Sequence, residues 1–233
     1  MKYGISAIAF DIDGTLYPSW RFNLRIIPFL LKNFNFMSAF NKTRKDIRLW
    51  QEKNPDKVLS NFFDFQAEIL AKHAGRNKED VKNFLETEIY EGWKKRFARI
   101  KPYFFARESI EEFKRCGLKI ALLSDFLPEQ KNDVWGILPL CDAAFGTEAI
   151  GALKPSPLPF KRLAEALDLP CDKILYVGNN LRYDVAGAKA AGMHTACIKS
   201  RLFILLKKVF AQKDNEKPDI YFSNYRQLLK FMI

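Results

Sequence analysis

Two carboxylates separated by one residue are the feature of this chain best suited to chemistry. Asp11 and Asp13 directly follow the apolar run 5–10, and Gly14 and Thr15 come next. Alternate residues of an extended chain point to the same side, so both carboxylates can address one ligand, and Gly14 permits a bend. Two like charges this close are costly unless a cation lies between them, and Mg²⁺ prefers such oxygen ligands. A strand followed by an ordinary Asx turn is the alternative interpretation.

Polar residues also follow three later apolar runs. Ser124 ends the run 118–123, Lys154 stands before a proline, and Asn179 and Asp184 follow the run 173–177. In parallel α/β folds the carboxyl ends of the strands meet at one edge, where ligands bind. Taken singly, each of these residues is typical of a turn or a surface. Taken together, they predict one polar site at the edge of a sheet.

The pattern of apolar residues predicts an α/β fold with a helical insert. Residues 17–101 have helical periodicity with no strand signal, whereas helices and short apolar strands alternate from residue 102 onward. We therefore expect a Rossmann-like parallel sheet with helices on both faces, formed by residues 1–16 and 102–233, and a small all-helical insert at 17–101. The expected strands are 5–10, 118–123, 143–146, 173–177, 195–198 and 218–222; the expected helices include 26–31, 37–50, 61–73, 81–93, 108–116, 157–167 and 185–191.

In this order, the polar residues resemble the four motifs of the haloacid dehalogenase-like (HAD) superfamily. The motifs are D-x-D-x-T/V, a Ser or Thr at the second strand end, a Lys, and an acidic loop of the G-D-x-x-x-D type. They correspond here to 11–15, Ser124, Lys154 and 178–184. An insert between the first two motifs looks like the helical C1-type cap of subfamily I, as in phosphoglycolate phosphatase-like members.

The resemblance implies a Mg²⁺-dependent phosphatase that forms an aspartyl-phosphate. Asp11 would be the nucleophile, and Asp13 would protonate the leaving alcohol and then activate water. Ser124 and Lys154 would bind the phosphoryl group. The metal would be held by Asp11, Asp13, Asn179 and Asp184. An acid at the position of Asp13 favours phosphate-ester hydrolysis, because the dehalogenase branch of the superfamily lacks one there.

Two departures from the family pattern keep a second hypothesis open. Asn179 replaces the usual first acid of the fourth motif, which predicts weaker metal binding. Asp125 stands where many relatives carry Asn, and its charge would repel phosphate unless a cation pairs with it. The alternative function is a phosphate-binding or regulatory module that has lost turnover.

Composition excludes several other classes. The chain has 233 residues, 48% of them hydrophobic, which excludes wholesale disorder. No apolar run reaches the roughly 18 residues of a membrane span, and the sequence enters its first strand without a leader, so we expect a cytoplasmic protein with no membrane span. Four scattered cysteines and two histidines predict reduced thiols rather than structural zinc.

The net charge of +11 is concentrated in the insert, where residues 17–101 carry 18 basic and 10 acidic side chains. A solvated helical surface or attraction of an anionic substrate both explain it. The partner expected is a small phosphorylated substrate; no nucleic-acid motif is present, and the protein is expected to be a monomer or homodimer. Candidate substrate contacts in the insert are Trp20, Arg21, Arg25, Arg44, Arg48 and Trp50, with packing in the cap core as the alternative for the aromatic ones. The basic-ended apolar segment 201–213 predicts a helix, packed on the core or used in a dimer or membrane-surface contact.

Overall fold

A six-stranded parallel sheet forms the centre of the protein. The computed structural model describes residues 4–206 and 213–233. The strands lie in the order β3-β2-β1-β4-β5-β6, and Ala7 of β1 is in register with both Lys119 and Ile174. Their bounds are β1 Ala7–Phe10, β2 Lys119–Ser124, β3 Ala143–Gly146, β4 Ile174–Gly178, β5 His194–Ile198 and β6 Ile220–Phe222. Both faces of the central strands are buried, which explains why these strands are apolar without alternation.

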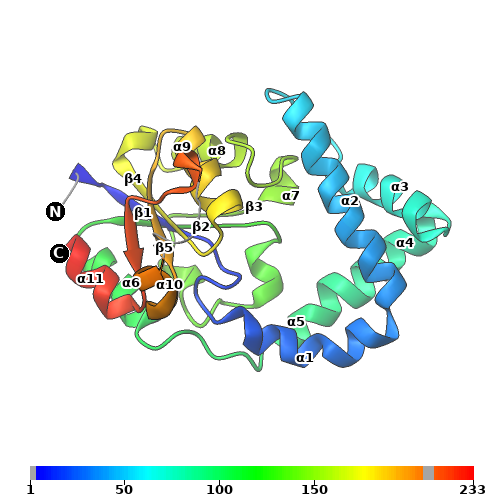
Figure 1. The fold of residues 1–233 in the computed structure, drawn as a ribbon, viewed down its shortest axis with the longest axis horizontal. Helices are drawn as coiled ribbons and strands as arrows, with labels where there is room; N and C mark the ends of the chain where they lie inside the picture. Colours follow the sequence, from blue (N-terminus) through cyan, green and yellow to red (C-terminus); the bar gives the residue numbers. More distant parts are fainter. Residues whose placement is uncertain (1–3, 207–212) are drawn as a thin grey trace.

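Helices cover both faces of this sheet (Figure 1). Ile8 and Phe10 pack with α6 (Ala106–Arg115) and α11 (Tyr225–Met232) on one face. Ala7 and Ala9 pack with α8 (Leu158–Ala166) and α9 (Ala186–Ala190) on the other. Shorter helical elements connect these layers: η3 Pro128–Lys131, η4 Leu138–Leu140, α7 Thr147–Ile150, η5 Cys171–Lys173, the π-helix η6 Leu181–Val185 and η7 Asp214–Glu216. The expected α/β fold with a Rossmann-like parallel sheet is confirmed.

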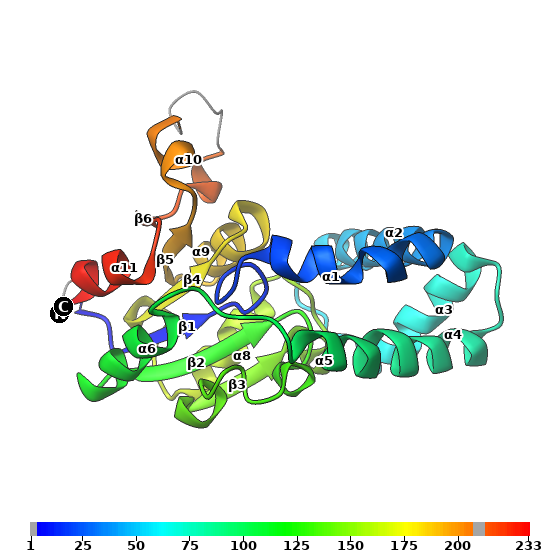
Figure 2. The same ribbon diagram turned by 90° about the horizontal axis from the view of Figure 1, so that it is seen from below.

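Residues between β1 and α6 form a helical segment beside the sheet, which Figure 2 shows extending away from the strands. Its elements are α1 Ser19–Lys32, α2 Phe34–Lys53, α3 Phe62–Ala74, α4 Lys78–Phe84, the π-helix η2 Leu85–Glu91 and α5 Gly92–Phe97. The segment has an apolar core of its own, which includes Phe36, Phe40, Leu70 and Ile89. It therefore packs chiefly on itself, not on the sheet.

The elements of the structure differ from those expected in several places; α1, for example, begins at Ser19 and not at residue 26. The helix expected at 81–93 continues from Lys78 to Phe97 and contains the π-helical stretch Leu85–Glu91. The C-terminal helix α11 was not predicted, although Leu228 and Met232 pack into the core of the sheet. A short helix, α7, follows β3 at once and was also missed.

The segment 201–213 is helical only in part. The helix α10 spans Arg201–Leu206, and residues 207–212 lie outside the described residues. Leu202 and Leu205 are 65% and 77% exposed, whereas the ring centroid of Phe203 lies 6.2 Å from that of Tyr221 in β6, so the described part of this helix contacts the sheet on one side only. No helix in the described residues is long and apolar enough to cross a membrane.

Candidate active site

The predicted site residues meet at the carboxyl edge of the central strands. β1 lies between β2 and β4, and the backbone N–H of Asp11 continues the pairing by donating to the carbonyl of Val177 at 2.9 Å. Gly14 then turns the chain with a φ of 81°, a conformation that favours glycine. A Cβ at Gly14 would also collide with the side chain of Asn179. The first and fourth motifs therefore approach as closely as a glycine allows.

Lys154 joins two buried carboxylates at this edge. Its Nζ lies 2.7 Å from Oδ1 of Asp11 and 2.7 Å from Oδ1 of Asp184. The other oxygen of Asp11 accepts a hydrogen bond from Oγ1 of Thr15 at 2.9 Å. The ammonium group of Lys154 also donates to the hydroxyl of Tyr176 in β4, at 3.3 Å. These contacts fix Asp11 in one orientation, as a nucleophile requires.

Asp13 lies next to Asp11 in a more open position. Its side chain is 40% exposed, whereas that of Asp11 is 6% exposed. The hydroxyl of Tyr17 donates to Oδ1 of Asp13 at 2.6 Å, and Oδ2 lies 3.0 Å from Nζ of Lys131. Ser124 donates to the same Oδ2 at 3.2 Å. Asp13 is thus held by neutral and cationic donors yet remains accessible from the cavity, as a proton-transfer group must be.

Burial and neighbouring charges change the pKa values of Asp11 and Lys154. Burial raises the pKa of Asp11 to about 7; Lys154 opposes this rise, and the carboxylates of Asp184 and Asp13 add to it. Burial by itself would lower the pKa of Lys154, but Asp11 and Asp184 outweigh it and raise that pKa well above its ordinary value. Lys154 is therefore held as a cation, and further positive charge at the edge would favour the ionised form of Asp11.

The donor set at this edge suits a hard cation. The side-chain amide of Asn179 has no hydrogen-bond partner among the described residues, and the backbone carbonyl of Asp13 accepts no hydrogen bond from them either. Both oxygens of Asp184 are used, Oδ1 by Lys154 and Oδ2 by the backbone N–H groups of Asn179 and Asn180 at 3.1 and 2.9 Å. No three His, Cys, Asp or Glu side chains in the described ranges form a ligand cluster, so a cation at this edge would also need the amide and the carbonyl as ligands. Oxygen donors of these types fit Mg²⁺.

The charge of Asp125 is neutralised by two arginines of the helical segment. Arg48 of α2 lies 2.7 Å and Arg44 3.5 Å from Oδ2 of Asp125, and Arg44 also pairs with the buried Glu148 of α7. Burial would raise the pKa of Asp125, but Arg48 and Arg44 hold it well below its ordinary range. Burial raises the pKa of Glu148 to about 6, against the effect of Arg44. The repulsion of phosphate that Asp125 could exert is thus cancelled by these partners.

A cavity of about 520 Å³ opens from the carboxylates toward the helical segment. Among the six candidate contacts in the insert, Arg48 lines it; Trp20, Arg21, Arg25, Arg44 and Trp50 do not. Arg44 is buried in its ion pairs, Arg21 donates to the carbonyls of Lys101 and Pro102, and Trp50 packs on Phe65. These five residues therefore do not line this cavity, although Arg44 lines an adjoining cavity that shares Arg48 and Phe126 with it.

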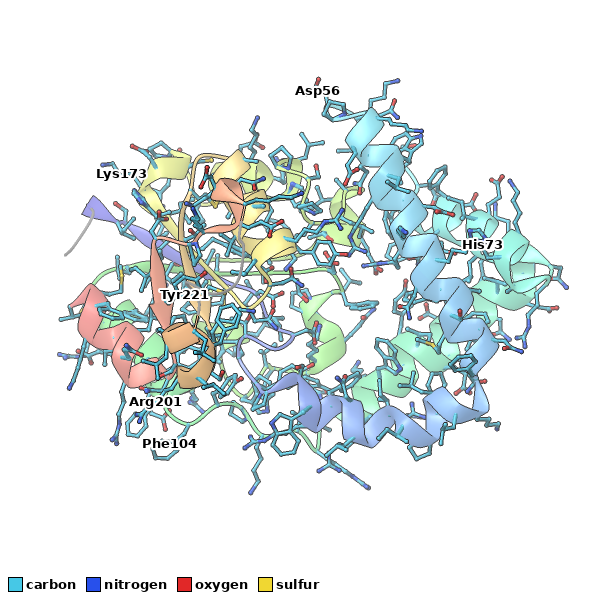
Figure 3. All side chains as sticks on the ribbon, viewed as in Figure 1. Asp56, His73, Phe104, Lys173, Arg201 and Tyr221 are labelled. Atoms are coloured by element: carbon cyan, nitrogen blue, oxygen red, sulfur yellow. The ribbon has the colours of Figure 1, made fainter. Side chains whose placement is uncertain are left out.

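The structure adds four residues that sequence reasoning did not assign: Thr15, Tyr17, Lys131 and Tyr176. Thr15 was part of the first motif but had no role, and Tyr17 follows Asp13 by four residues, a spacing that could have suggested a contact in a turn. Lys131 and Tyr176 reach the site from η3 and β4, and no local signal marks them. The two histidines are not part of this site. His73 lies on α3 (Figure 3), where it contacts Asp46, and His194 lies at the amino end of β5, away from the carboxyl edge.

The chain belongs to the haloacid dehalogenase-like hydrolases, whose family model matches residues 5–192. Membership defines it as a hydrolase. The six predicted site residues, Asp11, Asp13, Ser124, Lys154, Asn179 and Asp184, all gather at this edge.

Relatives within this family carry out two kinds of reaction. The chain is 28% identical to a phosphoglycolate phosphatase of Aquifex aeolicus, over 97% of this chain and 95% of the relative. It is 30% identical to an (S)-2-haloacid dehalogenase of Pseudomonas sp. strain YL, over 83% of this chain and 82% of the relative. Its fold is similar to that of a HAD phosphatase from Thermococcus onnurineus, with a TM-score of 0.62 and 19% identity over 98% of each chain. Phosphatase and dehalogenase must therefore be distinguished by the site.

Proposed function

We propose that this hydrolase is a Mg²⁺-dependent phosphatase that acts on a small phosphorylated metabolite through an aspartyl-phosphate. The observation that carries the proposal is the second carboxylate: Asp13 lies beside Asp11, exposed to the cavity and held by Tyr17. A phosphate ester needs a group that gives a proton to its leaving oxygen, and Asp13 is placed to do so. The phosphatase relatives support the same choice.

In the first step, an oxygen of Asp11 attacks phosphorus and the ester bond to the leaving oxygen breaks. Asp13 gives its proton to that oxygen, so an alcohol departs and a phosphoryl group remains on Asp11. Lys154 and Thr15 orient the carboxylate, and Lys154 offsets negative charge that builds up on the phosphoryl oxygens. Ser124 and Lys131 lie beside Asp13, where they can donate to the same oxygens.

In the second step, the ionised Asp13 takes a proton from water, which attacks the phosphorus. Inorganic phosphate leaves, Asp11 regains its carboxylate, and Asp13 has regained the proton that it lost. Tyr17 and Lys131 hold Asp13 in place through both steps. The buried Asp11 thus acts as the nucleophile, and the exposed Asp13 acts as the acid and then as the base.

Mg²⁺ would be held by Asp11, the backbone carbonyl of Asp13 and the amide of Asn179. We place Asp184 outside the direct ligands, because its Oδ2 accepts from two backbone N–H groups and its Oδ1 from Lys154. Each oxygen of Asp11 has only one donor and so keeps a lone pair for a cation. When bound, the cation would supply positive charge to the phosphoryl oxygens and to the nucleophile. With one carboxylate fewer than the usual motif, the site should bind Mg²⁺ weakly.

We further propose that residues 17–101 act as a cap over a catalytic core formed by 1–16 and 102–233. Arg44 and Arg48 bind Asp125 and Glu148 across the boundary, and the cavity lies between the two parts. A cap in this position excludes bulk water during the first step and must admit one water molecule for the second.

Steady-state hydrolysis of p-nitrophenyl phosphate with and without Mg²⁺ tests the proposal. Turnover that EDTA removes, together with its loss in Asp11→Asn, is the expected result. Release of halide from a 2-haloacid at a higher kcat/KM than release of phosphate from any ester would instead identify a dehalogenase.

A phosphate-binding module without turnover is the second candidate, and Asn179 is the observation that favours it. Calorimetry with inorganic phosphate and Mg²⁺ distinguishes the two. Clear phosphate binding without hydrolysis across a broad set of phosphomonoesters would favour the module.

A further inference from the structure

The cavity beside the carboxylates has an apolar wall. Phe22, Ile26 and Leu30 follow one another at intervals of four along α1, so they share the face of that helix that lines the cavity. Met37 of α2, Trp93 of α5 and Phe126, which follows β2, complete the wall. The opposite stripe of α1, with Leu24 and Leu31 at 58% and 74% exposed, does not reach the cavity.

Aromatic rings connect the cap and the core along this wall. The ring centroids of Phe22 and Trp93 are 5.4 Å apart, and those of Trp93 and Phe126 are 5.5 Å apart, both nearly edge to face. Phe22 and Trp93 come from the helical segment, whereas Phe126 comes from the core. A flat apolar group in the cavity would therefore contact rings from both parts of the protein, which is a favourable surface for an aromatic ring.

The part of the cavity next to the apolar wall offers a second anionic group no free cation from the described part of the chain, whereas Lys45 lines an adjoining cavity that shares Met37, Asn41 and Arg48 with it. Among the described residues that line the cavity beside the carboxylates, three are cationic: Arg48, Lys131 and Lys154. Arg48 is paired with Asp125, Lys131 lies 3.0 Å from Asp13, and Lys154 lies between Asp11 and Asp184. A carboxylate or second phosphate on the substrate would have to be desolvated there without a partner, which is costly.

Amide side chains supply the remaining polarity. Asn23, Asn41 and Gln130 line the same cavity, and their side chains form no hydrogen bond with any described residue. Amides donate and accept, so they suit a hydroxyl, a carbonyl or a ring nitrogen rather than a charge.

We propose that the substrate is a phosphomonoester whose leaving group is uncharged and contains an apolar ring. The proposal rests on the proposed function and narrows it. It also separates this chain from its relative in Aquifex aeolicus, which is named for phosphoglycolate, because the leaving group of phosphoglycolate carries a carboxylate. The basic surface of the cap then has no direct role in recognition.

A binding experiment tests this preference without turnover. Calorimetry with Mg²⁺ compares phenylphosphonate, whose ring can reach the apolar wall, with phosphonoacetate, whose carboxylate cannot find a cation. We expect phenylphosphonate to bind about tenfold more tightly or better, from the apolar area that it buries. Equal or tighter binding of phosphonoacetate would overturn the proposal.

A kinetic comparison uses the same contrast. The kcat/KM for 1-naphthyl phosphate should exceed that for 2-phosphoglycolate by about tenfold or more. A preference for phosphoglycolate would refute the ring-bearing substrate and leave the phosphatase standing. If phenylphosphonate binds preferentially but no ester is hydrolysed, the proposed preference for an apolar ring is supported and the proposed phosphatase function is refuted.

Two neighbouring substitutions on α1 locate the effect. Asn23→Arg places a free cation in the cavity, whereas Leu24→Arg places the same charge on the exposed stripe. Both positions are exposed, so neither change should prevent folding. We expect Asn23→Arg to shift the ratio of kcat/KM toward phosphoglycolate by about tenfold, and Leu24→Arg to leave it unchanged. An unchanged ratio in Asn23→Arg, or equal shifts in both variants, would show that this face of α1 does not contact the substrate.

Discussion

The two carboxylates differ because their surroundings differ. Asp11 is buried against Lys154 and Thr15, whereas Asp13 is exposed to the cavity and bound by the hydroxyl of Tyr17. A fixed, buried group suits attack on phosphorus, and an accessible group suits exchange of protons with alcohol and water. The same residue type thus serves two roles two positions apart.

Replacing Asp13 by Asn should lower kcat by about 10²- to 10⁴-fold, the usual contribution of a proton-transfer group. The loss should be larger for an alkyl phosphate than for p-nitrophenyl phosphate, because nitrophenolate leaves without a proton. With the latter substrate, attack of water becomes slow, and a phosphoryl group on Asp11 should be detected by mass spectrometry. Asp11→Asn is the control that cannot be phosphorylated there. Equal losses for both substrates, without a phosphoryl-enzyme, would remove Asp13 from this role.

Asn179→Asp should tighten Mg²⁺ by about tenfold, since it adds one formal charge to the ligand set. The neighbouring change Asn180→Asp is the matched control, because the side chain of Asn180 instead accepts from the backbone N–H groups of Arg182 and Tyr183. Calorimetric titration of Mg²⁺ without substrate measures both. If Asn179→Asp binds no more tightly than the wild type, or no more tightly than Asn180→Asp, then Asn179 is not a ligand.

At the scale of elements, the sequence predicted those site residues whose position depends on a single strand. Asp11, Ser124 and Asn179 each end or follow an apolar run, and a parallel sheet brings such ends together regardless of loop length. The pairing of Arg48 with Asp125 could not be predicted in this way. It joins residues 77 apart in sequence, from a helix and a loop whose relative placement depends on packing of the whole helical segment. The same holds for Lys131 and for the π-helical stretch in the cap.

This pairing predicts an acid-dependent contribution to stability. The pKa of Asp125 in the folded protein lies below the 3.8 of an unperturbed Asp, because Arg48 and Arg44 outweigh its burial. The ion pair therefore stabilises the fold fully above pH 3.8, and its contribution is lost as the pH falls below 3.8, where the unfolded chain binds the proton first.

Asp125→Asn should accordingly lower the free energy of unfolding at pH 7 by up to about 3 kcal/mol, since it leaves buried arginines underpaired. The difference from the wild type should stay constant above pH 3.8 and narrow as the pH falls from 3.8 to about 2. Urea unfolding over this range measures it, with Asp56→Asn in an exposed loop as the control. A constant difference across the range would mean that Asp125 is not ionised in the folded protein.

At the scale of the whole molecule, the excess positive charge of the helical segment lies apart from the cations of the active site. The helical segment carries most of the net charge of +11, yet the cations that line the cavity are all paired with carboxylates. Arg44 and Arg48, which the sequence suggested as substrate contacts, form ion pairs that join the helical segment to Asp125 and Glu148. Reversing their charge would disturb that connection, so it cannot test whether the basic surface attracts substrate.

Exposed basic residues that do not line the cavity provide that test. Arg25, Lys32 and Lys42 lie on α1 and α2, and their joint replacement by Gln removes three positive charges without breaking any described ion pair. If recognition depends on the apolar wall, kcat/KM for 1-naphthyl phosphate should fall less than about threefold between roughly 50 and 500 mM salt, where screening shortens the Debye length to a few ångströms. The triple variant should follow the same curve as the wild type. A tenfold fall in the wild type that disappears in the triple variant would instead show that the basic surface of the cap concentrates an anionic substrate at the entrance of the cavity.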